Sequence, residues 1–366
     1  MKKILVTGDA VFLRRYKPLF EEMARECKDL NYLIGDQRFE IDILNQAAKI
    51  LNKLIYLASP LYANRRGKNA LAFISKSKRV ERKIRQLSDP PDYVLHIFGT
   101  YSPFWDKFDI PYGMLLDYTM SLAHKNWTPW CPFANTQQLV EWIKYERLAY
   151  QRSQHIFAMS NLVKSSLIDN YGIEPEKICV VGSFANNHPL YKGEKNFGNQ
   201  QILFNGSEFE RKGGDIVLAA FQQVKEVLQE AKLTIIGKNA KNLPNGAENR
   251  GRIASLEAMR QLFLETDLVL ASARCDPFPS FVIEAMNYGV PCIVSSNDGM
   301  PEIVDDGING LVVDPLTAEL LAEKIINLLG DRAKLNSMSA LSRQKVKTQL
   351  NCQAIAKKIM QALSAK

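Results

Sequence analysis

Short apolar runs alternate with segments of helical periodicity along most of the chain. A short, mainly apolar run between turn residues is typical of a buried strand, and apolar residues three or four positions apart are typical of a helix. The alternation of the two patterns predicts an α/β fold with parallel sheets. The runs predict strands at residues 3–7, 93–98, 112–116, 155–159, 178–181, 201–204, 233–236, 268–271, 291–295 and 311–313.

Helical periodicity fills many of the intervals between these strands. Thr136 is predicted to cap one helix, and Glu146 and Arg147 are predicted to be solvated charges on it. The pattern predicts helices near residues 68–87, 137–152, 214–229, 255–266, 280–288, 300–305, 317–330 and 351–364.

The chain of 366 residues can bury two substantial cores. Residues 183–200 are polar and rich in glycine and asparagine, which favours a linker between domains. We therefore predict an N-terminal Rossmann-like domain at residues 1–185, a linker at 186–200, a second Rossmann-like domain at 201–345 and a C-terminal helix at 346–366.

The net charge of +8 is concentrated in the first half, where residues 1–185 hold 26 Lys and Arg against 19 Asp and Glu. The excess peaks between Arg65 and Arg85, where the only acid is Glu81. Apolar residues at helical spacing make residues 68–87 a candidate basic amphipathic helix. It either docks on an anionic membrane or packs its apolar stripe on the first sheet with its charges in water. The stripe consists of Phe73, Val80, Ile84 and Leu87.

Other features bear on location and metals. No apolar run approaches the ~18 residues of a membrane span, and the apolar start at Ile4 stops at Thr7, too early for a signal peptide. The six cysteines form no CxxC pair, and no histidine lies at zinc-ligand spacing from them. We expect a cytoplasmic protein without a metal site, peripheral on the inner face of the membrane if the basic helix docks there.

Two carboxylates, Asp276 and Glu284, flank a loop of Pro, Phe and Ser residues just before a buried strand. A carboxylate near a helix start can accept hydrogen bonds from ligand hydroxyls, and the N–H groups of the same turn can meet an anion. This element could therefore hold a sugar at one end and a nucleotide at the other. The alternative is that Glu284 only caps its helix and Asp276 only begins a turn.

Arg211 and Lys212 precede Gly213 and Gly214, where a helix is predicted to begin. Side-chain cations and helix N–H groups can converge there on one phosphate group. A reaction that releases a diphosphate needs such fixed positive charge, because negative charge grows on the leaving group. The alternative is an exposed charged turn.

Three residues of the first half follow predicted strands, where ligands usually bind in parallel sheets. Gly8 is a candidate for contact with donor or acceptor, or a plain tight turn. Asp117 is a candidate for acceptor contact, or a cap. Ser160 is a candidate cleft residue, or an ordinary N-cap.

Four segments resemble, in order and spacing, the motifs of family-4 glycosyltransferases. They are residues 204–214, 276–284, 299–304 and 306–312. The resemblance implies the GT-B fold, in which two Rossmann-like domains face each other across a cleft and the last helix crosses back onto the first domain. It also implies a retaining, metal-independent transfer of a sugar from a nucleotide-diphosphate donor, with the acceptor on the first domain.

The resemblance also implies roles for single residues. Glu284 would bind ribose hydroxyls, Asp276 the donor sugar, and Arg211 and Lys212 the diphosphate. The remaining donor-binding candidates are Gly206, Ser207, Pro279, Ser280 and Phe281. The chain departs from the family pattern at Asp276, usually Glu, and at Ser207, where many members carry Arg. It also has no histidine at the strand end before Asp117.

The sequence thus predicts a glycosyltransferase that moves a sugar from a nucleotide sugar to a glycan, lipid or lipid-linked acceptor. It predicts no cofactor and no nucleic acid partner. Two alternatives stay open: a non-catalytic protein of the same fold that binds an anionic lipid or polymer, and a nucleotide-sugar epimerase.

Overall fold

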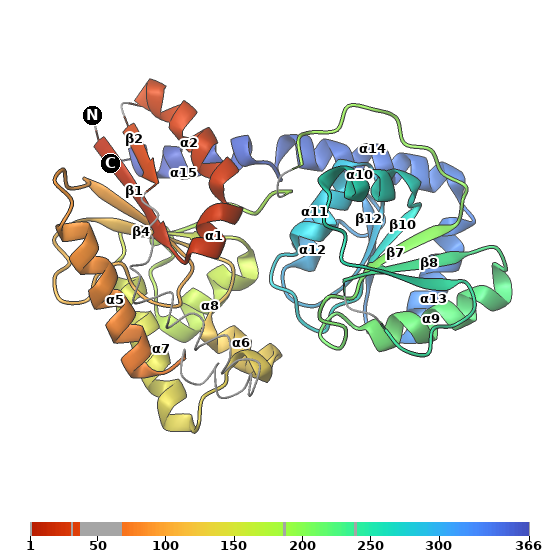
Figure 1. The fold of residues 1–366 in the computed structure, drawn as a ribbon, viewed down its shortest axis with the longest axis horizontal. Helices are drawn as coiled ribbons and strands as arrows, with labels where there is room; N and C mark the ends of the chain where they lie inside the picture. The colour runs from red at the N-terminus through yellow and green to blue at the C-terminus, as the bar shows by residue number, and fades with distance from the viewer. Residues whose placement is uncertain (1, 31, 37–67, 186–187, 238–239, 366) are drawn as a thin grey trace. The chain divides into compact units, whose positions relative to one another are not determined.

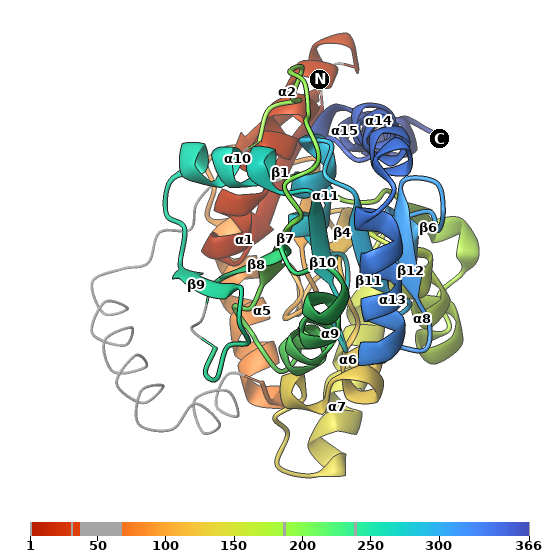
Figure 2. The same cartoon turned by 90° about the vertical axis from the view of Figure 1, so that its right-hand side faces the viewer.

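The computed structural model describes residues 2–30, 32–36, 68–185, 188–237 and 240–365. The chain divides into two compact units. The first consists of Met1–Val181 together with Ala356–Lys366, and the second of Gly182–Ile355. In each unit helices pack around one parallel sheet (Figures 1 and 2).

Among the described residues, six strands form the sheet of the first unit, in the order β2-β1-β3-β4-β5-β6, and every neighbouring pair is parallel. Strands β3 and β4 are buried at every residue, as expected for apolar runs covered on both faces. The strands are β1 (Lys2–Gly8), β2 (Tyr32–Asp36), β3 (Tyr93–Ile97), β4 (Tyr112–Leu116), β5 (His155–Ala158) and β6 (Ile178–Val180).

Helices α5, α7 and α8 contribute Phe73, Trp142 and Leu167 to the core of this unit. The helices described here are α1 (Ala10–Arg15), α2 (Lys17–Leu30), α5 (Ala70–Arg85), α6 (Met120–Asn126), α7 (Thr136–Arg152), α8 (Asn161–Tyr171) and α15 (Cys352–Ser364), with 3-10 turns at Thr128–Trp130 and Pro175–Lys177.

The described strands of the second unit form a parallel sheet in the order β12-β11-β10-β7-β8-β9. They are β7 (Gln201–Asn205), β8 (Lys232–Ile236), β9 (Ala247–Gly251), β10 (Leu268–Ala271), β11 (Cys292–Ser295) and β12 (Gly310–Val313). Its helices are α9 (Gly214–Val227), α10 (Leu256–Glu265), α11 (Ser280–Asn287), α12 (Met300–Ile303), α13 (Ala318–Leu329) and α14 (Arg332–Thr348).

The strand order fixes where this second unit can bind a ligand. From β7 the chain moves outward to β8 and β9, then returns to place β10 on the other side of β7. Such a reversal leaves an opening at the carboxyl ends of the two central strands. The loops that follow β7 and β10 hold Arg211, Lys212 and Asp276, so the topology brings the predicted donor residues to one place.

The predicted strands are all present, and so are the predicted helices, within a few residues at their ends. The sequence missed β2, β9, α1, α2, α6 and α14. The cap of α7 is Asn135, whose side chain accepts from the N–H of Gln138, rather than Thr136. Thr136 is the first helical residue instead.

Glu146 on α7 is buried, only 4% exposed, which corrects the prediction of a solvated charge. Its carboxylate accepts hydrogen bonds from the Nε1 of Trp142 (3.1 Å), from the Tyr171 hydroxyl and from the N–H of Met120 (3.3 Å). Burial disfavours the charged form and raises the pKa of Glu146 to about 7 despite these bonds. Glu146 lies one turn after Trp142, and residues one turn apart share a helix face.

Glu146→Gln is expected to remove part of the pH dependence of stability. Because folding raises the pKa of this carboxyl from its ordinary 4.5 to about 7, the folded state loses stability as the pH rises through that range. Chemical denaturation at about pH 5 and about pH 8 measures the effect. The wild-type protein should lose about 2–3 kcal/mol more than the variant between these pH values.

Glu81→Gln supplies the matched control. Glu81 is also 4% exposed, but hydrogen bonds outweigh its burial and lower the pKa of its carboxyl. The stability it contributes is present above its ordinary pKa and is lost only in acid. The difference between wild type and Glu81→Gln should therefore stay constant over the same pH range. A constant difference for Glu146→Gln as well would refute the raised pKa.

Candidate functional site

The loop after β7 is shaped by Gly213, the residue that caps α9. Gly213 has a left-handed backbone conformation (φ 72°), and a Cβ atom there would overlap the carbonyl oxygen of Ser272. Only glycine fits this position without displacing the backbone. The tight turn places the two preceding residues, Arg211 and Lys212, beside the loop that follows β10.

Both cations lie next to Asp276. Its Oδ2 is 3.4 Å from the Nη1 of Arg211 and 3.7 Å from the Nζ of Lys212. The N–H of Asp276 donates to the Oδ2 of Asp298 (2.8 Å), on the loop after β11. Asp298 has φ 52°, a strained conformation for a residue with a side chain. Three loops at the carboxyl edge of the sheet thus meet at Asp276.

The guanidinium of Arg211 is already engaged within the protein. Nε and Nη2 donate to the two carboxylate oxygens of Glu208 (2.9 and 2.7 Å), and Nη1 donates to the carbonyl of Cys275 (2.5 Å). Burial lowers the pKa of Arg211, but Glu208 and Asp276 outweigh burial and raise it. Arg211 therefore holds the loops after β7 and β10 together. Its predicted role as a diphosphate ligand stays a prediction.

Lys212 is differently placed. Its side chain is 15% exposed, and its described charged contact is the longer one to Asp276. Burial lowers the pKa of Lys212, while Asp276 opposes the shift. A weakly compensated ammonium group in a mostly buried position favours the arrival of an anion.

Helices α9 and α11 both begin near the site, but they differ in the acidic and capping side chains around their first N–H groups. Helix α9 has Asp215 in its first turn, where the N–H groups of Asp215 and Ile216, after the larger effect of Arg274, lower the pKa of that carboxyl. Helix α11 starts after Pro279, and within the described residues no side chain caps it and no acid lies in its first turn. An incoming anion is therefore expected at the start of α11.

Glu284 lies in the second turn of α11, with its side chain 15% exposed. Its Oε2 is 3.9 Å from the Nε2 of His188, a partly buried residue whose Nδ1 is 2.9 Å from the hydroxyl of Tyr288. The predicted alternative that Glu284 caps its own helix does not hold, because Pro279 is the N-cap residue.

The other predicted donor residues lie in the same loops. Gly206 is buried, and a Cβ atom there would lie 3.1 Å from the Cγ2 of Ile235. Ser207 is exposed, and its N–H donates to the Oδ1 of Asn205 (3.1 Å). Ser280 and Phe281 form the first turn of α11. Their contacts with a donor stay predictions.

The predicted acceptor residues of the first unit also lie at strand ends. Gly8 (φ 153°) ends β1, where a Cβ atom would lie 3.0 Å from the carbonyl oxygen of Ile97. Ser160 caps α8 through its hydroxyl, which accepts from Val163 (3.2 Å). Asp117 follows β4 and is half-buried, and it is not the cap of α6, because Thr119 fills that position. These structural roles leave their predicted acceptor contacts untested.

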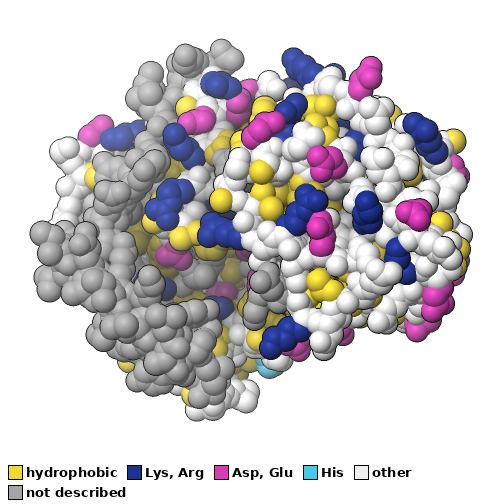
Figure 3. All heavy atoms as spheres, turned by 45° about the vertical axis from the view of Figure 1, so that its right-hand side comes forward, with side chains coloured by type: hydrophobic (Ala, Val, Ile, Leu, Met, Phe, Trp, Pro, Cys, Tyr) yellow, Lys and Arg dark blue, Asp and Glu magenta, His cyan; other side chains and the backbone are white. Residues whose placement is uncertain are grey.

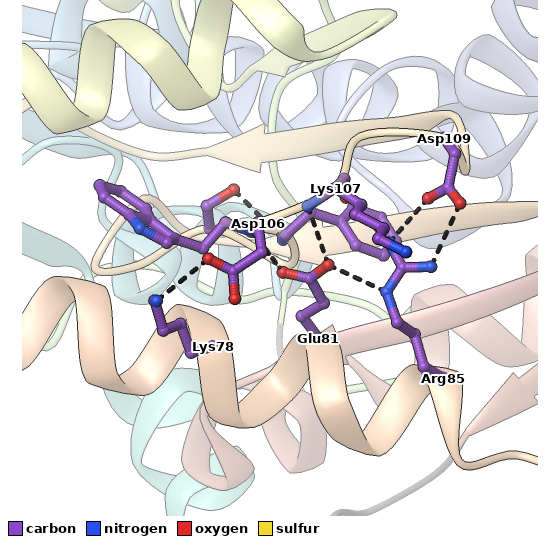
Figure 4. A network of polar contacts seen from close by, with 9 residues as sticks. Lys78, Glu81, Arg85, Asp106, Lys107 and Asp109 are labelled. Carbon is purple, nitrogen blue, oxygen red and sulfur yellow. Dashed lines mark hydrogen bonds and ion pairs between the residues drawn. The ribbon is translucent and has the colours of Figure 1, made fainter.

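Helix α5, the predicted basic helix, is fastened to the loop of residues 105–109 by a polar network (Figure 4). The carboxylate of Glu81 accepts from the N–H groups of Trp105, Asp106 and Lys107 at 2.7–3.0 Å. Arg85 joins Glu81 to Asp109, and Lys78 pairs with Asp106 (3.0 Å).

The apolar stripe of α5 faces the core of the first unit, where Phe73 and Ile84 are fully buried. Arg79 and Arg82 stay exposed on the helix surface. The stripe therefore packs inside the protein, as one of the two sequence interpretations expected, and the exposed charge of the helix is smaller than its composition suggests.

Basic and acidic side chains are interspersed on the molecular face that Figure 3 presents. In the part of the chain that the structure describes, no helix is long and apolar enough to cross a membrane. Over the same residues, no group of three or more His, Cys, Asp or Glu is placed to hold a metal ion.

The protein has the GT-B glycosyltransferase fold, since solved structures of this class share it over nearly the whole chain. Sucrose-phosphate synthase (tll1590) from Thermosynechococcus elongatus aligns with a TM-score of 0.67 and 15% identity, covering 99% of this chain and 98% of that one. Anabaena Alr3699/HepE, solved in complex with UDP-glucose, aligns with a TM-score of 0.62 and 16% identity over 100% of both chains.

Sequence comparison shows which family the second half of the chain resembles. Residues 191–345 match the family of glycosyl transferases group 1. The uncharacterized glycosyltransferase MJ1178 of Methanocaldococcus jannaschii is 28% identical over 194 residues, which cover 50% of this chain and 52% of that protein. The chain spans about half the length of several curated relatives that it matches. Residues 191–345, which hold the whole Arg211–Glu284 site, are thus similar to the group 1 glycosyl transferases.

Three residues of the site were missed by sequence reasoning: Glu208, Asp298 and His188. Glu208 and Asp298 lie inside or beside the segments that resemble family motifs, so a signal for them existed. His188 lies in the predicted linker, and nothing in its sequence surroundings pointed to Glu284.

Proposed function

We propose that the protein is a glycosyltransferase whose second unit binds a nucleotide-diphosphate sugar. The observation that carries the proposal is the meeting of Lys212, Asp276 and the start of α11 at the reversal point of the second sheet. These groups offer a cation, a hydroxyl acceptor and backbone N–H donors within one site. The family match and the UDP-glucose complex of the Anabaena protein support a nucleotide sugar as the donor.

The mechanism follows from where charge develops. As the bond between sugar and diphosphate breaks, negative charge grows on the leaving oxygen. Lys212 and the N-terminus of α11 stabilise that charge without reorganising, because the turn at Gly213 and the contacts of Arg211 hold their loops in place. Asp276 orients the donor sugar, and Glu284 accepts hydrogen bonds from the nucleotide's hydroxyls. We propose that transfer proceeds with retention at the anomeric carbon and without a metal cofactor.

The acceptor is proposed to bind the first unit, at the strand ends that carry Gly8, Asp117 and Ser160. A glycan, a lipid or a lipid-linked sugar fits the proposal. The half-buried carboxylate of Asp117 supplies an acceptor for sugar hydroxyls. A cytoplasmic location on the inner face of the membrane remains part of this proposal.

Replacing Glu284 should change mainly the affinity for the donor, and replacing Asp276 should change mainly kcat. Glu284→Ala is expected to weaken binding of the nucleotide sugar by at least tenfold, because buried ligand hydroxyls lose a charged acceptor. Asp276→Asn is expected to lower kcat more than affinity, because it contacts the sugar. Calorimetry and steady-state kinetics measure the two effects, with Glu323→Ala on the exposed surface of α13 as the control. If Asp276→Asn changed only nucleotide affinity, the two roles would be reversed.

We further propose that α5 brings the protein to anionic membranes through its exposed arginines. Arg79→Glu combined with Arg82→Glu should abolish co-sedimentation with vesicles that contain anionic lipid, since each basic residue contributes ~1 kcal/mol at the surface. Lys78 and Arg85 should matter less, because Asp106 and Asp109 neutralise them.

Arg332→Glu combined with Lys334→Glu makes the same change of charge on exposed residues of α14 and is the control. Wild-type binding should require anionic lipid and fall with salt. Equal loss in the control, or equal binding to neutral vesicles, would leave a water-soluble acceptor as the better account.

A further inference from the structure

We propose that His188 is a positioning residue for Glu284. Residues 188–191, near the beginning of the second unit, would then form part of the nucleotide site. The proposal rests on the donor site proposed above. Sequence reasoning placed this segment in a linker, whereas the structure packs it against α11.

Three contacts fasten the segment to that helix. His188 lies between Tyr288 and Glu284, at 2.9 and 3.9 Å. The side chain of Asn287 donates to the carbonyl of Pro189 (2.9 Å) and accepts from the N–H of Tyr191 (3.3 Å). The position of the segment and the position of the helix that carries Glu284 are therefore coupled.

The imidazole is in a setting that defines its chemistry. Its side chain is 4% exposed, and the ring meets those of Phe263 and Tyr288 edge-on. Burial lowers the pKa of His188, so the ring is neutral near pH 7. A neutral imidazole carries one proton, and the nitrogen that carries it is set by the partners of both nitrogens.

The neighbouring carboxylate decides the tautomer. A lone pair on Nε2 facing the negative charge of Glu284 would be repelled, so the proton lies on Nε2 and Nδ1 accepts from the Tyr288 hydroxyl. At 3.9 Å the Nε2–H attracts the carboxylate as a dipole and does not form a direct hydrogen bond. The oxygens of Glu284 can still accept from the ribose hydroxyls, while the contact with His188 restricts the orientation of the carboxylate.

The test compares two ligands that differ only where Glu284 acts. The affinities of wild-type protein, His188→Leu and His188→Gln are measured by calorimetry for UDP, GDP and ADP. The best binder is then compared with its 2′,3′-dideoxy analogue. We expect His188→Leu to lower the preference for the ribose form about fivefold. His188→Gln should retain most of the preference, because its amide N–H replaces the Nε2–H.

His155→Leu is the matched control, because His155 is also a partly buried histidine whose Nδ1 lies beside a tyrosine hydroxyl, that of Tyr93 at 3.1 Å. It lies in the first unit and should leave the preference unchanged. If His188→Leu weakens the binding of both ligands equally, the preference for the ribose form is unchanged. That result would overturn the positioning role.

The outcomes also separate this inference from the proposed function. If the wild-type protein binds none of the diphosphates, or binds ribose and dideoxy forms equally, the donor site itself is wrong and the inference falls with it. If wild type prefers the ribose form and Glu284→Ala loses that preference but His188→Leu keeps it, only the inference is wrong.

Discussion

Replacing Lys212 by alanine is expected to lower the kcat of sugar transfer by about 10²- to 10³-fold, the loss found when one donor that stabilises developing charge is removed. Lys212 lies in the loop after β7, and its described ion-pair partner, Asp276, lies 3.7 Å away in the loop that leads to α11. Because the diphosphate carries more charge on leaving than in the bound donor, the loss should appear in kcat more than in donor affinity. Steady-state kinetics at saturating donor measures it.

The stability of this variant should change little. Burial disfavours the charged form of Lys212, so its removal relieves a desolvation cost while it leaves Asp276 with Arg211. Lys334→Ala, on the exposed surface of α14, is the control for loss of a positive charge. A Lys212→Ala protein with full turnover would exclude Lys212 from the site of diphosphate release.

Replacing Arg211 by alanine is expected to reduce both stability and turnover. Arg211 is 6% exposed and joins Glu208, the carbonyl of Cys275 and Asp276. Its loss removes the guanidinium group that joins these groups, which we expect to lower the free energy of unfolding of the second unit by about 2–3 kcal/mol. This is below the range for fully buried pairs, because Glu208 is 54% exposed. Arg211→Lys should recover only part, since Lys lacks the two-pronged fork.

Arg274→Ala is the control, because it removes another arginine that binds a carboxylate through two nitrogens. Arg274 binds both carboxylate oxygens of Asp215 (2.7 and 2.6 Å), but its side chain is 35% exposed. Its removal should cost about 1 kcal/mol or less. Chemical denaturation of both variants decides the point. Equal small losses would mean that Arg211 does not hold the loops together.

The sequence predicted those features that depend on short-range pattern. The strands of both sheets, except β2 and β9, were found because buried parallel strands are short apolar runs. The proximity of Arg211, Lys212 and Asp276 is predictable from the sequence, because loops after central parallel strands meet at one edge of the sheet. The helix start predicted at Gly213 and Gly214 is confirmed, since α9 begins at Gly214.

Two of the missed elements, β9 and α14, lack that pattern. Strand β9 (Ala247–Gly251) is an edge strand with exposed, polar residues, and α14 is a mostly polar helix. The burial of Glu146 follows from Trp142 and Tyr171, the second of which lies on another helix. His188 reaches Glu284 from about a hundred residues away in the chain, and no local rule could supply that contact.

The most direct test of the donor site is a calorimetric titration of the full chain with UDP-, GDP- and ADP-sugars up to about 1 mM, the upper end of common KM values. The account predicts that one class of nucleotide sugar binds the wild-type protein at one site per chain, and that the Lys212→Ala, Glu284→Ala double variant binds it no longer. Absence of binding by every nucleotide sugar, or equal binding by the double variant, would contradict the account.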